Sequence, residues 1–217
     1  MLDPPRQGAA ESVLECRRAG IRTVMITGDH PETALAIAKK LHIANSSSDV
    51  RTGAQLDALS DSAFLSTAEH ASVFARVTPA HKLKIVRALK KSGHIVAMTG
   101  DGVNDAPAVK EADIGVSMGK NGTDVTREAS GIVLLDDDFS TLVSAVEEGR
   151  IIYQNIRKFI RYLLSCNIGE VVTMFFGMLM GMPVVLLPIQ ILMVNLVTDG
   201  IPAIALSFDP PQDDVMK

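Results

Sequence analysis

The chain contains 217 residues, 47% of them hydrophobic, and carries a formal net charge of −4. This length allows one sizeable domain, or a small domain joined to something else. The first 161 residues are balanced in charge, because the whole net charge arises from position 162 onward; this balance argues against a dedicated nucleic-acid surface. The two cysteines, Cys16 and Cys166, have no cysteine or histidine neighbours at ligand spacing, so they predict neither a disulfide nor a zinc site.

The first 138 residues alternate short apolar runs with amphipathic segments. They predict strands at 21–26, 73–76, 94–98, 114–117 and 132–134, and helices at 11–19, 31–41, 60–70, 79–91 and 104–111. Pro31 opens the second of these helices, at a position where a missing N–H costs nothing. Alternation of this kind is typical of βαβ units, so we expect an α/β domain with a parallel sheet over 1–138.

Two Thr-Gly-Asp tripeptides each follow a predicted strand, at 27–29 and 99–101. Ligands of parallel sheets bind beyond the carboxyl ends of the strands. One tripeptide alone could be a simple turn, but two at matching strand ends favour a shared site. In the first, the hydroxyl of Thr27 and the N–H of Gly28 stand just before a predicted helix, followed by Asp29. This is an arrangement that binds anions.

The second tripeptide continues as TGDGVNDAPAVK over 99–110. Asp101 and Asp105 flank a turn eased by glycines, and Asn104 adds an amide; such carboxylates can hold Mg²⁺ beside a phosphate. Lys82 is a candidate counter-charge, although a solvated helix face explains it better when it is taken alone. Together these groups predict phosphoryl transfer, which depends on positioning and charge neutralisation. A P-loop is excluded, because no glycine-rich loop ends in Lys-Ser or Lys-Thr.

From residue 139 to 161 the chain predicts one long helix with basic residues near its end. Two apolar runs follow, at 162–182 and 184–208, each long enough to cross the roughly 30 Å hydrocarbon core of a bilayer. The basic flank places that side in the cytoplasm, so the chain would cross, turn sharply and return, leaving 209–217 cytoplasmic. A pair of buried core helices is the alternative, which the lengths and the basic flank disfavour.

Each apolar run contains polar side chains that are costly inside a bilayer and are therefore functional candidates. Residues three or four positions apart share a helix face. By that rule each run has one polar face, formed by Asn167 and Glu170 in the first and by Asn195, Thr198 and Asp199 in the second. Oxygen donors of this kind suit a hard cation, Ca²⁺ most naturally, and Gly200 and Pro202 would loosen the second helix and free backbone carbonyls. The alternative is a hydrogen-bonded network between helices, which two carboxylates disfavour.

Several motifs resemble the phosphorylation domain of a P-type ATPase, a member of the haloacid-dehalogenase-like superfamily: DPPR at 3–6, TGD at 27–29, FARVTPAHK at 74–82 and TGDGVNDAPAVK at 99–110. NIGE at 167–170 and VNLVTDGIPA at 194–203 are similar to the fifth and sixth membrane helices of calcium pumps of the sarcoplasmic-reticulum type. The resemblance implies an incomplete haloacid-dehalogenase-like parallel sheet with flanking helices (1–138), a stalk helix (139–161), and a transmembrane hairpin (162–182 and 184–208) with a cytoplasmic tail (209–217).

The resemblance also implies which ion is carried and which residues act. Sodium/potassium pumps carry an acidic residue where Asn195 stands, and secretory-pathway calcium pumps lack an acid at the position of Glu170. Ca²⁺ is therefore favoured, with Mn²⁺ and Na⁺ as alternatives. The implied catalytic and Mg²⁺-binding residues are Thr27, Gly28, Asp29, Lys82, Asp101, Asn104 and Asp105. ATP would lie beside Asp3, Arg6 and Arg76, and the transported cation would be held by Asn167, Glu170, Asn195, Thr198 and Asp199.

The family's nucleophile is an aspartate in a DKTGT motif, which occurs nowhere in the 217 residues. The partners implied are a nucleotide-binding domain, an actuator domain, further membrane helices and the bilayer itself, which we expect to be a bacterial plasma membrane. We therefore expect a fragment of a Ca²⁺ pump that is inactive alone and whose sheet exposes an unpaired edge. The alternatives are a membrane-anchored phosphate-binding or phosphatase-like module and a non-enzymatic modulator of a complete pump.

Overall fold

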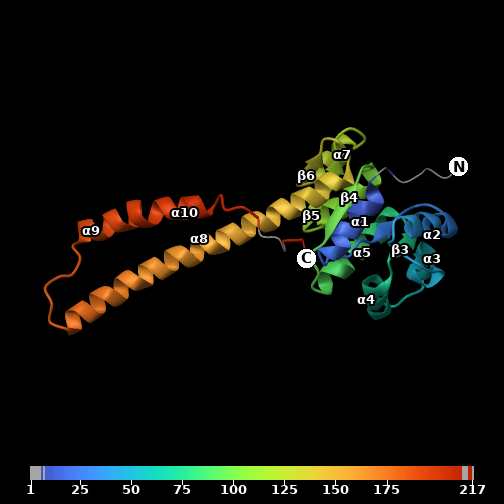
Figure 1. Cartoon of the computed structure of the whole chain (residues 1–217). Helices are drawn as coiled ribbons and strands as arrows, with labels where there is room; N and C mark the ends of the chain where they lie inside the picture. The colour runs from blue at the N-terminus through green and yellow to red at the C-terminus, as the bar shows by residue number, and fades with distance from the viewer. Residues whose placement is uncertain (1–5, 7, 212–214, 217) are drawn as a thin grey trace. The chain divides into compact units, whose positions relative to one another are not determined.

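The computed structural model describes residues 6, 8–211, 215 and 216, so Asp3, predicted beside ATP, lies outside the described residues. The chain divides into two compact units, Met1–Ser144 with Lys217, and Ala145–Met216, and each is described by itself (Figure 1). The predicted domain boundary, after residue 138, lies slightly before the boundary between these units. Residues 139–144 group with the first unit and include the buried Val143.

All strands of the first unit pair in parallel, in two three-stranded sheets. The first sheet has the order β1-β3-β2 and consists of β1 (Met25–Ile26), β2 (Val50–Thr52) and β3 (Val73–Ala75). The second has the order β4-β5-β6 and consists of β4 (Ala97–Gly100), β5 (Ile114–Met118) and β6 (Ile132–Leu134). The predicted α/β class with parallel strands is confirmed. The single predicted sheet is two sheets, because no strand in the described part of the chain joins β1 to β4, and each of these is an edge strand.

Strand lengths differ from the predicted ones because a strand extends only as far as its partner. β1 occupies the end of the predicted 21–26 run, since its partner β3 begins at Val73, opposite Met25. β4 starts later than predicted and continues to Gly100, which pairs with Ser117 of β5. Thr99 and Gly100, the start of the second Thr-Gly-Asp tripeptide, therefore lie inside a strand.

The helices of the first unit are α1 (Ala9–Arg18), α2 (Pro31–Lys40), α3 (Gly53–Asp57), α4 (Asp61–His70), α5 (Pro79–Lys91), α6 (Ala106–Glu111) and α7 (Asp124–Ala129). Local capping explains why α5 agrees with the predicted 79–91: Pro79 opens it, and Thr78 accepts a hydrogen bond from the N–H of His81. A 3₁₀ turn, Val103–Asp105, precedes α6 in the predicted 104–111 helix. The sequence did not predict β2, α3 or α7, which are too short to show a clear apolar period.

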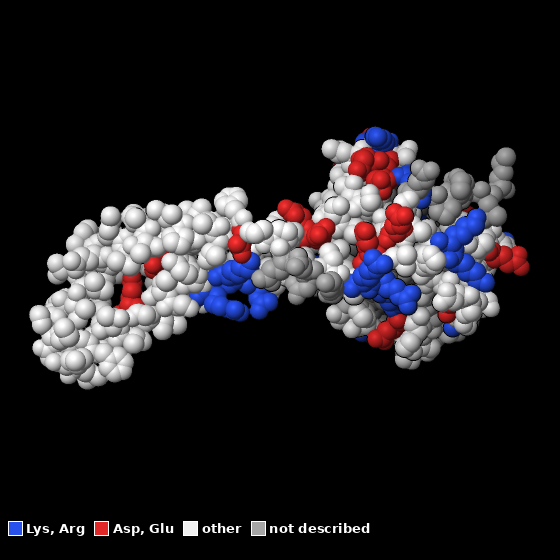
Figure 2. Space-filling view, viewed as in Figure 1, with Lys and Arg blue, Asp and Glu red and all other residues white. Residues whose placement is uncertain are grey.

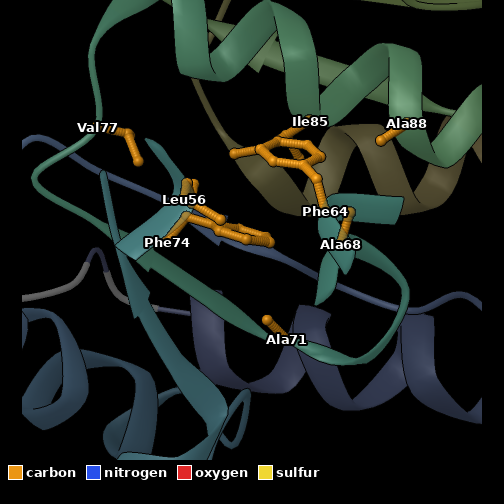
Figure 3. Close-up of a cluster of buried hydrophobic side chains, with 8 residues drawn as sticks. All are labelled: Leu56, Phe64, Ala68, Ala71, Phe74, Val77, Ile85 and Ala88. Atoms are coloured by element: carbon orange, nitrogen blue, oxygen red, sulfur yellow. The ribbon is translucent and has the colours of Figure 1, made fainter. Parts of the chain in front are cut away.

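The largest buried side chains lie between β3 and the helices α3, α4 and α5 (Figure 3). Phe74 of β3 packs with Phe64 of α4 and Ile85 of α5, each at most 2% exposed. Burying one such side chain contributes about 2–3 kcal/mol. A second cluster places Ile26 of β1 against a group that contains Met98 of β4, so apolar packing holds the two edge strands in one unit.

The second unit consists of the rest of α8 (Phe139–Leu179), followed by α9 (Pro188–Met193), a π-helix (Val194–Asp199) and α10 (Gly200–Leu206). By length and composition, the helical stretches Phe139–Leu179 and Pro188–Leu206 could each cross a membrane. Only 6% and 11% of their most apolar windows are buried, whereas a pair of soluble core helices would be mostly buried. Figure 2 shows this unit as a long surface with little charge, with basic side chains gathered at one end.

A glycine ends α8. Gly181 has a φ of 68°, the N–H of Met182 bonds to the carbonyl of Gly177 at 3.0 Å, and the N–H of Gly181 bonds to that of Met178 at 3.1 Å. This is the Schellman pattern of a helix C-terminus. The connection to α9 therefore runs over 180–187, which is longer than the predicted junction before residue 184.

The segment after α10 packs against the part of α8 before the predicted span. The buried amide of Asn155 donates to the carbonyls of Asp209, at 2.9 Å, and Ser207, at 3.4 Å. Lys158 forms an ion pair with the Asp209 carboxylate, and Arg150 donates to the carbonyl of Val215 at 3.0 Å. These contacts return the chain to α8 and close the hairpin.

Candidate functional site

The loop after β4 is built around the buried carboxylate of Asp105, which is 7% exposed. This carboxylate accepts a hydrogen bond from the ammonium of Lys82, and its second oxygen faces the N–H of Gly102 at 3.4 Å. A Cβ on Gly100 would lie 2.5 Å from the Cβ of Asp105, so only glycine permits this approach. The loop is therefore compact and anchored to α5 by a charge-assisted hydrogen bond.

Lys82 does not lie on a solvated helix face, the alternative that its position alone favoured. Its side chain is 17% exposed and paired with Asp105. Since α5 follows β3 of the first sheet and Asp105 follows β4 of the second, this pair connects the ends of both sheets.

Asp101 leads the same loop, and its side chain is exposed while its backbone is fixed. Its carbonyl accepts a hydrogen bond from the N–H of Thr123 at 2.9 Å. The hydroxyl of Thr126, which is fully buried, donates to the carbonyl of Gly102 at 2.8 Å. Asn104 is also exposed. A carboxylate held out toward solvent from a fixed backbone can receive a cation without rebuilding the loop.

The first Thr-Gly-Asp loop closes on itself at the end of β1. The hydroxyl of Thr27 donates to the Asp29 carboxylate at 2.8 Å and accepts from the Asp29 N–H at 3.1 Å. The carbonyl of Asp29 accepts a hydrogen bond from the N–H of Arg76 at 3.0 Å, so Arg76, predicted beside ATP, lies against this loop. Gly28 at its tip is exposed, with no atom near the position of a Cβ. Both predicted loops thus follow edge strands, as expected for a ligand site in a parallel fold.

Arg6 lies elsewhere in the first unit. Its guanidinium donates to the backbone carbonyl of Asp137, in the junction between β6 and α8. A role of Arg6 toward ATP stays a prediction.

In the second unit the structure brings together two of the five predicted ion ligands. The amide of Asn195 donates to Glu170 Oε2 at 3.1 Å and to the carbonyl of Ile191 at 3.0 Å. Asp199 is 4% exposed. Glu170 Oε1 and Asp199 Oδ2 are buried with no hydrogen-bond partner among the described residues. A buried carboxylate oxygen without a donor is costly, and a bound cation would offset that cost.

The π-helix over Val194–Asp199 contains Asn195, Thr198 and Asp199. Such a widened turn is frequent at functional sites. It ends before Gly200, and α10 continues through Gly200 and Pro202, so the loosening expected from these two residues stays a prediction. Pro202 has no N–H to donate back along the helix.

Asn167 and Thr198 are two further predicted ligands, and both are exposed. The amide of Asn167 donates to the carbonyl of Leu163 in its own helix at 2.9 Å. Within the described residues, no three His, Cys, Asp or Glu side chains gather as a metal site. An ion here would therefore need amide, hydroxyl or carbonyl oxygens, or ligands from further helices.

The sequence did not identify Thr123 and Thr126, the residues that hydrogen-bond to the backbone of the second Thr-Gly-Asp loop. Their signal was present, because Thr123 is the N-cap of α7 and accepts from the N–H of Thr126. A threonine before a short helix and an aspartate in its first turn are typical of a helix N-terminus, but capping alone does not say which loop the helix supports.

Comparison with known proteins gives the family. Residues 1–113 match the haloacid dehalogenase-like hydrolase family, and residues 183–217 match the C-terminus of cation-transporting ATPases. Over 217 residues the chain is 60% identical to a "Calcium-transporting ATPase" of Bacillus subtilis (strain 168), and it covers 24% of that protein. Over 221 aligned residues it is 55% identical to "Endoplasmic reticulum calcium ATPase srcA" of Aspergillus fumigatus, of which it covers 23%. The chain thus spans about a quarter of the length of these relatives.

Solved structures give the same assignment. A crystal structure of a zinc-transporting PIB-type ATPase superposes with a TM-score of 0.68 at 29% identity, over 94% of this chain and 27% of that one. A second crystal structure with the same description, in a different state, gives a TM-score of 0.65 at 29% identity, over 93% and 27%. The chain therefore belongs to the haloacid dehalogenase-like family and, within it, to the cation-transporting P-type ATPases.

Proposed function

We propose that the chain is the part of an ATP-driven Ca²⁺ pump that joins the phosphoryl-transfer loops to two ion-binding membrane helices. The observation that carries the proposal is the pair of buried oxygens, Glu170 Oε1 and Asp199 Oδ2, that face no donor. The Bacillus and Aspergillus relatives are both named as calcium ATPases, which supports Ca²⁺ as the ion. We also propose a bacterial plasma membrane as its location, and the Bacillus relative supports the bacterial part of this proposal.

The second Thr-Gly-Asp loop fits a magnesium site. Asp101 offers an exposed carboxylate on a fixed backbone, and Asn104 lies in the same loop; oxygen donors of this kind are the ones Mg²⁺ prefers. When bound, the ion neutralises charge on the phosphoryl oxygens. Asp105 would hold the Lys82 ammonium in place, so that this cation faces the same oxygens.

The first loop would bind the phosphoryl group from the other side. The N–H of Gly28 and the hydroxyl of Thr27 are the donors. Because the Thr27 hydrogen is directed to Asp29, it must turn away from that carboxylate to reach a phosphoryl oxygen. The exchange is between two anionic acceptors, so it costs little.

The nucleophile would come from outside this chain. β1 and β4 are edge strands whose carboxyl ends lead into the two loops, and an edge strand can accept a further strand. A strand inserted between them would place its own carboxyl end beside both loops. An aspartate there would attack the γ-phosphorus of ATP, ADP would leave, and water would later hydrolyse the aspartyl phosphate. ATP itself would be bound by a nucleotide-binding domain.

In the membrane unit, Ca²⁺ would take up Glu170 Oε1 and Asp199 Oδ2. The Asn195 amide would rotate, because its NH₂ group now faces Glu170 and only its oxygen can bind a cation. Asn167 and Thr198 are proposed as further ligands, together with oxygens from other membrane helices.

The proposal is tested in membrane vesicles that contain the longer protein. We expect Ca²⁺-dependent transfer of labelled phosphate from ATP to the protein, together with Ca²⁺ uptake. Asp101→Asn should abolish the phosphoenzyme, whereas Asp199→Asn should only raise the Ca²⁺ concentration that phosphoenzyme formation requires. The 217-residue chain alone should form no phosphoenzyme. Phosphoenzyme formation that another cation supports and Ca²⁺ does not would contradict the proposed ion.

A further inference from the structure

A buried aspartate stands at the junction between β6 and α8. Asp137 is 3% exposed and has a φ of 59°, in the left-handed region that non-glycine residues rarely adopt. The next residue but one, Phe139, begins α8. A strained, buried acid is kept only where the surrounding structure requires it.

The Asp137 carboxylate is bound on both oxygens by one turn of the chain. The N–H of Lys120 donates to Oδ1 at 3.0 Å, and the N–H of Asn121 donates to Oδ2 at 2.9 Å. Burial raises the pKa of this carboxyl, but hydrogen bonds from Lys120, Asn121 and Gly119 outweigh it and leave the pKa below its usual value. The group is therefore an anion at neutral pH.

The turn at 119–122 is closely packed, because its glycines leave no room for a side chain. A Cβ on Gly119 would lie 2.8 Å from the carbonyl oxygen of Leu134, and one on Gly122 would lie 1.9 Å from that of Met118. The guanidinium of Arg127 also donates to the Gly119 carbonyl at 2.9 Å. A displacement of one end of this turn must therefore move the other.

The far end of the turn reaches the candidate Mg²⁺ loop. Thr123, directly after Gly122, donates its N–H to the carbonyl of Asp101, and Thr126 donates its hydroxyl to Gly102. Hydrogen bonds thus tie residues 120 and 121 to the Asp137 carboxylate and Thr123 to the loop, and the backbone of 119–123 connects the two contacts.

The near end reaches the first turn of α8. The neighbours of Asp137 fix this turn: Asp138 accepts from the N–H of Ser140 at 2.9 Å, and Asp136 accepts from the hydroxyl of Thr141 at 2.5 Å. α8 then continues for 41 residues without a proline, so a rotation at its start is carried along one continuous helix.

We propose that Asp137 is the positioning residue through which the Mg²⁺ loop acts on the start of α8. The inference rests on the proposed function. When a phosphoryl group and Mg²⁺ displace Asp101, the turn at 119–122 moves with it, and the Asp137 carboxylate passes that movement to α8. Asp137 touches neither phosphate nor ion, so its loss should separate the two activities of the pump rather than abolish either.

The test compares Asp137→Asn with Asp138→Asn in vesicles that contain the longer protein. An asparagine at 137 keeps the shape but presents an NH₂ group to one of the two backbone donors. At 138 the same change removes the same charge and leaves a residue that caps helices equally well. We expect Asp137→Asn to form phosphoenzyme as the unaltered protein does, but to carry roughly five-fold fewer Ca²⁺ ions per ATP hydrolysed, a typical coupling effect. Asp138→Asn should leave this ratio unchanged.

A second pair of variants acts at the loop end of this connection, at Thr126. Thr126→Val removes the hydroxyl bond to Gly102 and should lower the transport ratio as Asp137→Asn does, whereas Thr126→Ser retains the hydroxyl and should not. This pair decides the question if Asp137→Asn fails to fold.

The outcomes are distinct. Equal transport ratios for the unaltered protein and for Asp137→Asn, or for Thr126→Val where Asp137→Asn does not fold, would overturn the inference. So would a parallel loss of phosphoenzyme and transport, which indicates only a structural role. If the unaltered protein forms no Ca²⁺-dependent phosphoenzyme, the proposed function itself fails.

Discussion

Buried carboxylates occur in both units, but their surroundings differ. In the first unit, Asp137 receives a backbone N–H on each oxygen and Asp105 is paired with Lys82. In the second, Glu170 and Asp199 each keep one buried oxygen without a donor among the described residues. Turns and loops leave N–H groups free to bind an acid, whereas a continuous helix uses its own N–H groups internally.

This difference separates two uses of a buried acid. Where donors surround the carboxylate, its charge is already neutralised and it can fix the backbone. Where donors are missing, the buried charge is costly until a cation approaches. The predictions below test that distinction, from the largest expected effect to the smallest.

The largest effect is expected at Asp199. Asp199→Asn should weaken Ca²⁺ binding by roughly 1,000-fold, because a charged ligand is lost. It should also stabilise the ion-free protein by about 1 kcal/mol, since an unpaired buried charge is removed. Ca²⁺ dependence of the phosphoenzyme and thermal unfolding in detergent measure the two effects. Asp209→Asn, which breaks only the pair with Lys158, is the control and should leave Ca²⁺ affinity unchanged. An ion-free protein that Asp199→Asn destabilises would contradict the distinction.

Removing Lys82 should turn Asp105 from a buried carboxylate with a cationic partner into one without such a partner. Lys82→Met leaves the Asp105 carboxylate buried without its cation, at an expected cost of about 3 kcal/mol in the free energy of unfolding. The double variant Lys82→Met/Asp105→Asn should regain most of this loss, because no charge is left unpaired. Chemical denaturation of the four proteins in this cycle gives the coupling directly. Simple addition of the two single effects would show that the pair is not the source of the cost.

The sequence predicted features set by neighbouring residues more accurately than features set by residues far along the chain. Helix α5 agreed with its predicted bounds because Thr78 and Pro79 act within one turn. The extent of β1 depended instead on where β3 begins, which lies far along the chain. The two-sheet arrangement could not be read from periodicity, because it depends on which strands find a partner.

The candidate site likewise contains residues that the sequence identified and residues whose role depends on the fold. The two Thr-Gly-Asp loops and the polar side chains of the two apolar helical stretches were visible as sequence motifs. The pairing of Lys82 with Asp105 depends on how α5 is packed, and alone Lys82 looked like a surface residue. Asp137 lay unnoticed in a run of three aspartates, 136–138, since only the fold decides which of them is buried.

The low pKa of Asp137 should be visible in how the stability of the protein depends on pH. Because hydrogen bonds hold the folded-state pKa below the unfolded value of about 4, the ionised group stabilises the fold above that pH. The contribution is lost as the pH falls through the folded-state pKa. Asp137→Asn should therefore flatten the acid side of the stability profile relative to the unaltered protein, and Asp138→Asn should not. Thermal unfolding from pH 7 down to about 3 makes this comparison, and parallel profiles for both variants would argue against a bound Asp137 anion.

The smallest effect is expected at an exposed carboxylate, because water supplies its hydrogen-bond donors. Asp61 is 94% exposed and lies 3.4 Å from the half-exposed Lys84, so Asp61→Asn should change the free energy of unfolding by less than about 0.5 kcal/mol. Lys84→Ala should cost more, because the ammonium also lies 4.4 Å from the ring centre of the buried Phe64, a contact that contributes about 0.5–1 kcal/mol at an exposed site. Urea denaturation of both variants at low and high salt separates the two, since salt screens the ion pair more strongly than the ring contact. If Asp61→Asn cost as much as Lys84→Ala, exposure would not be what distinguishes this acid from the buried ones.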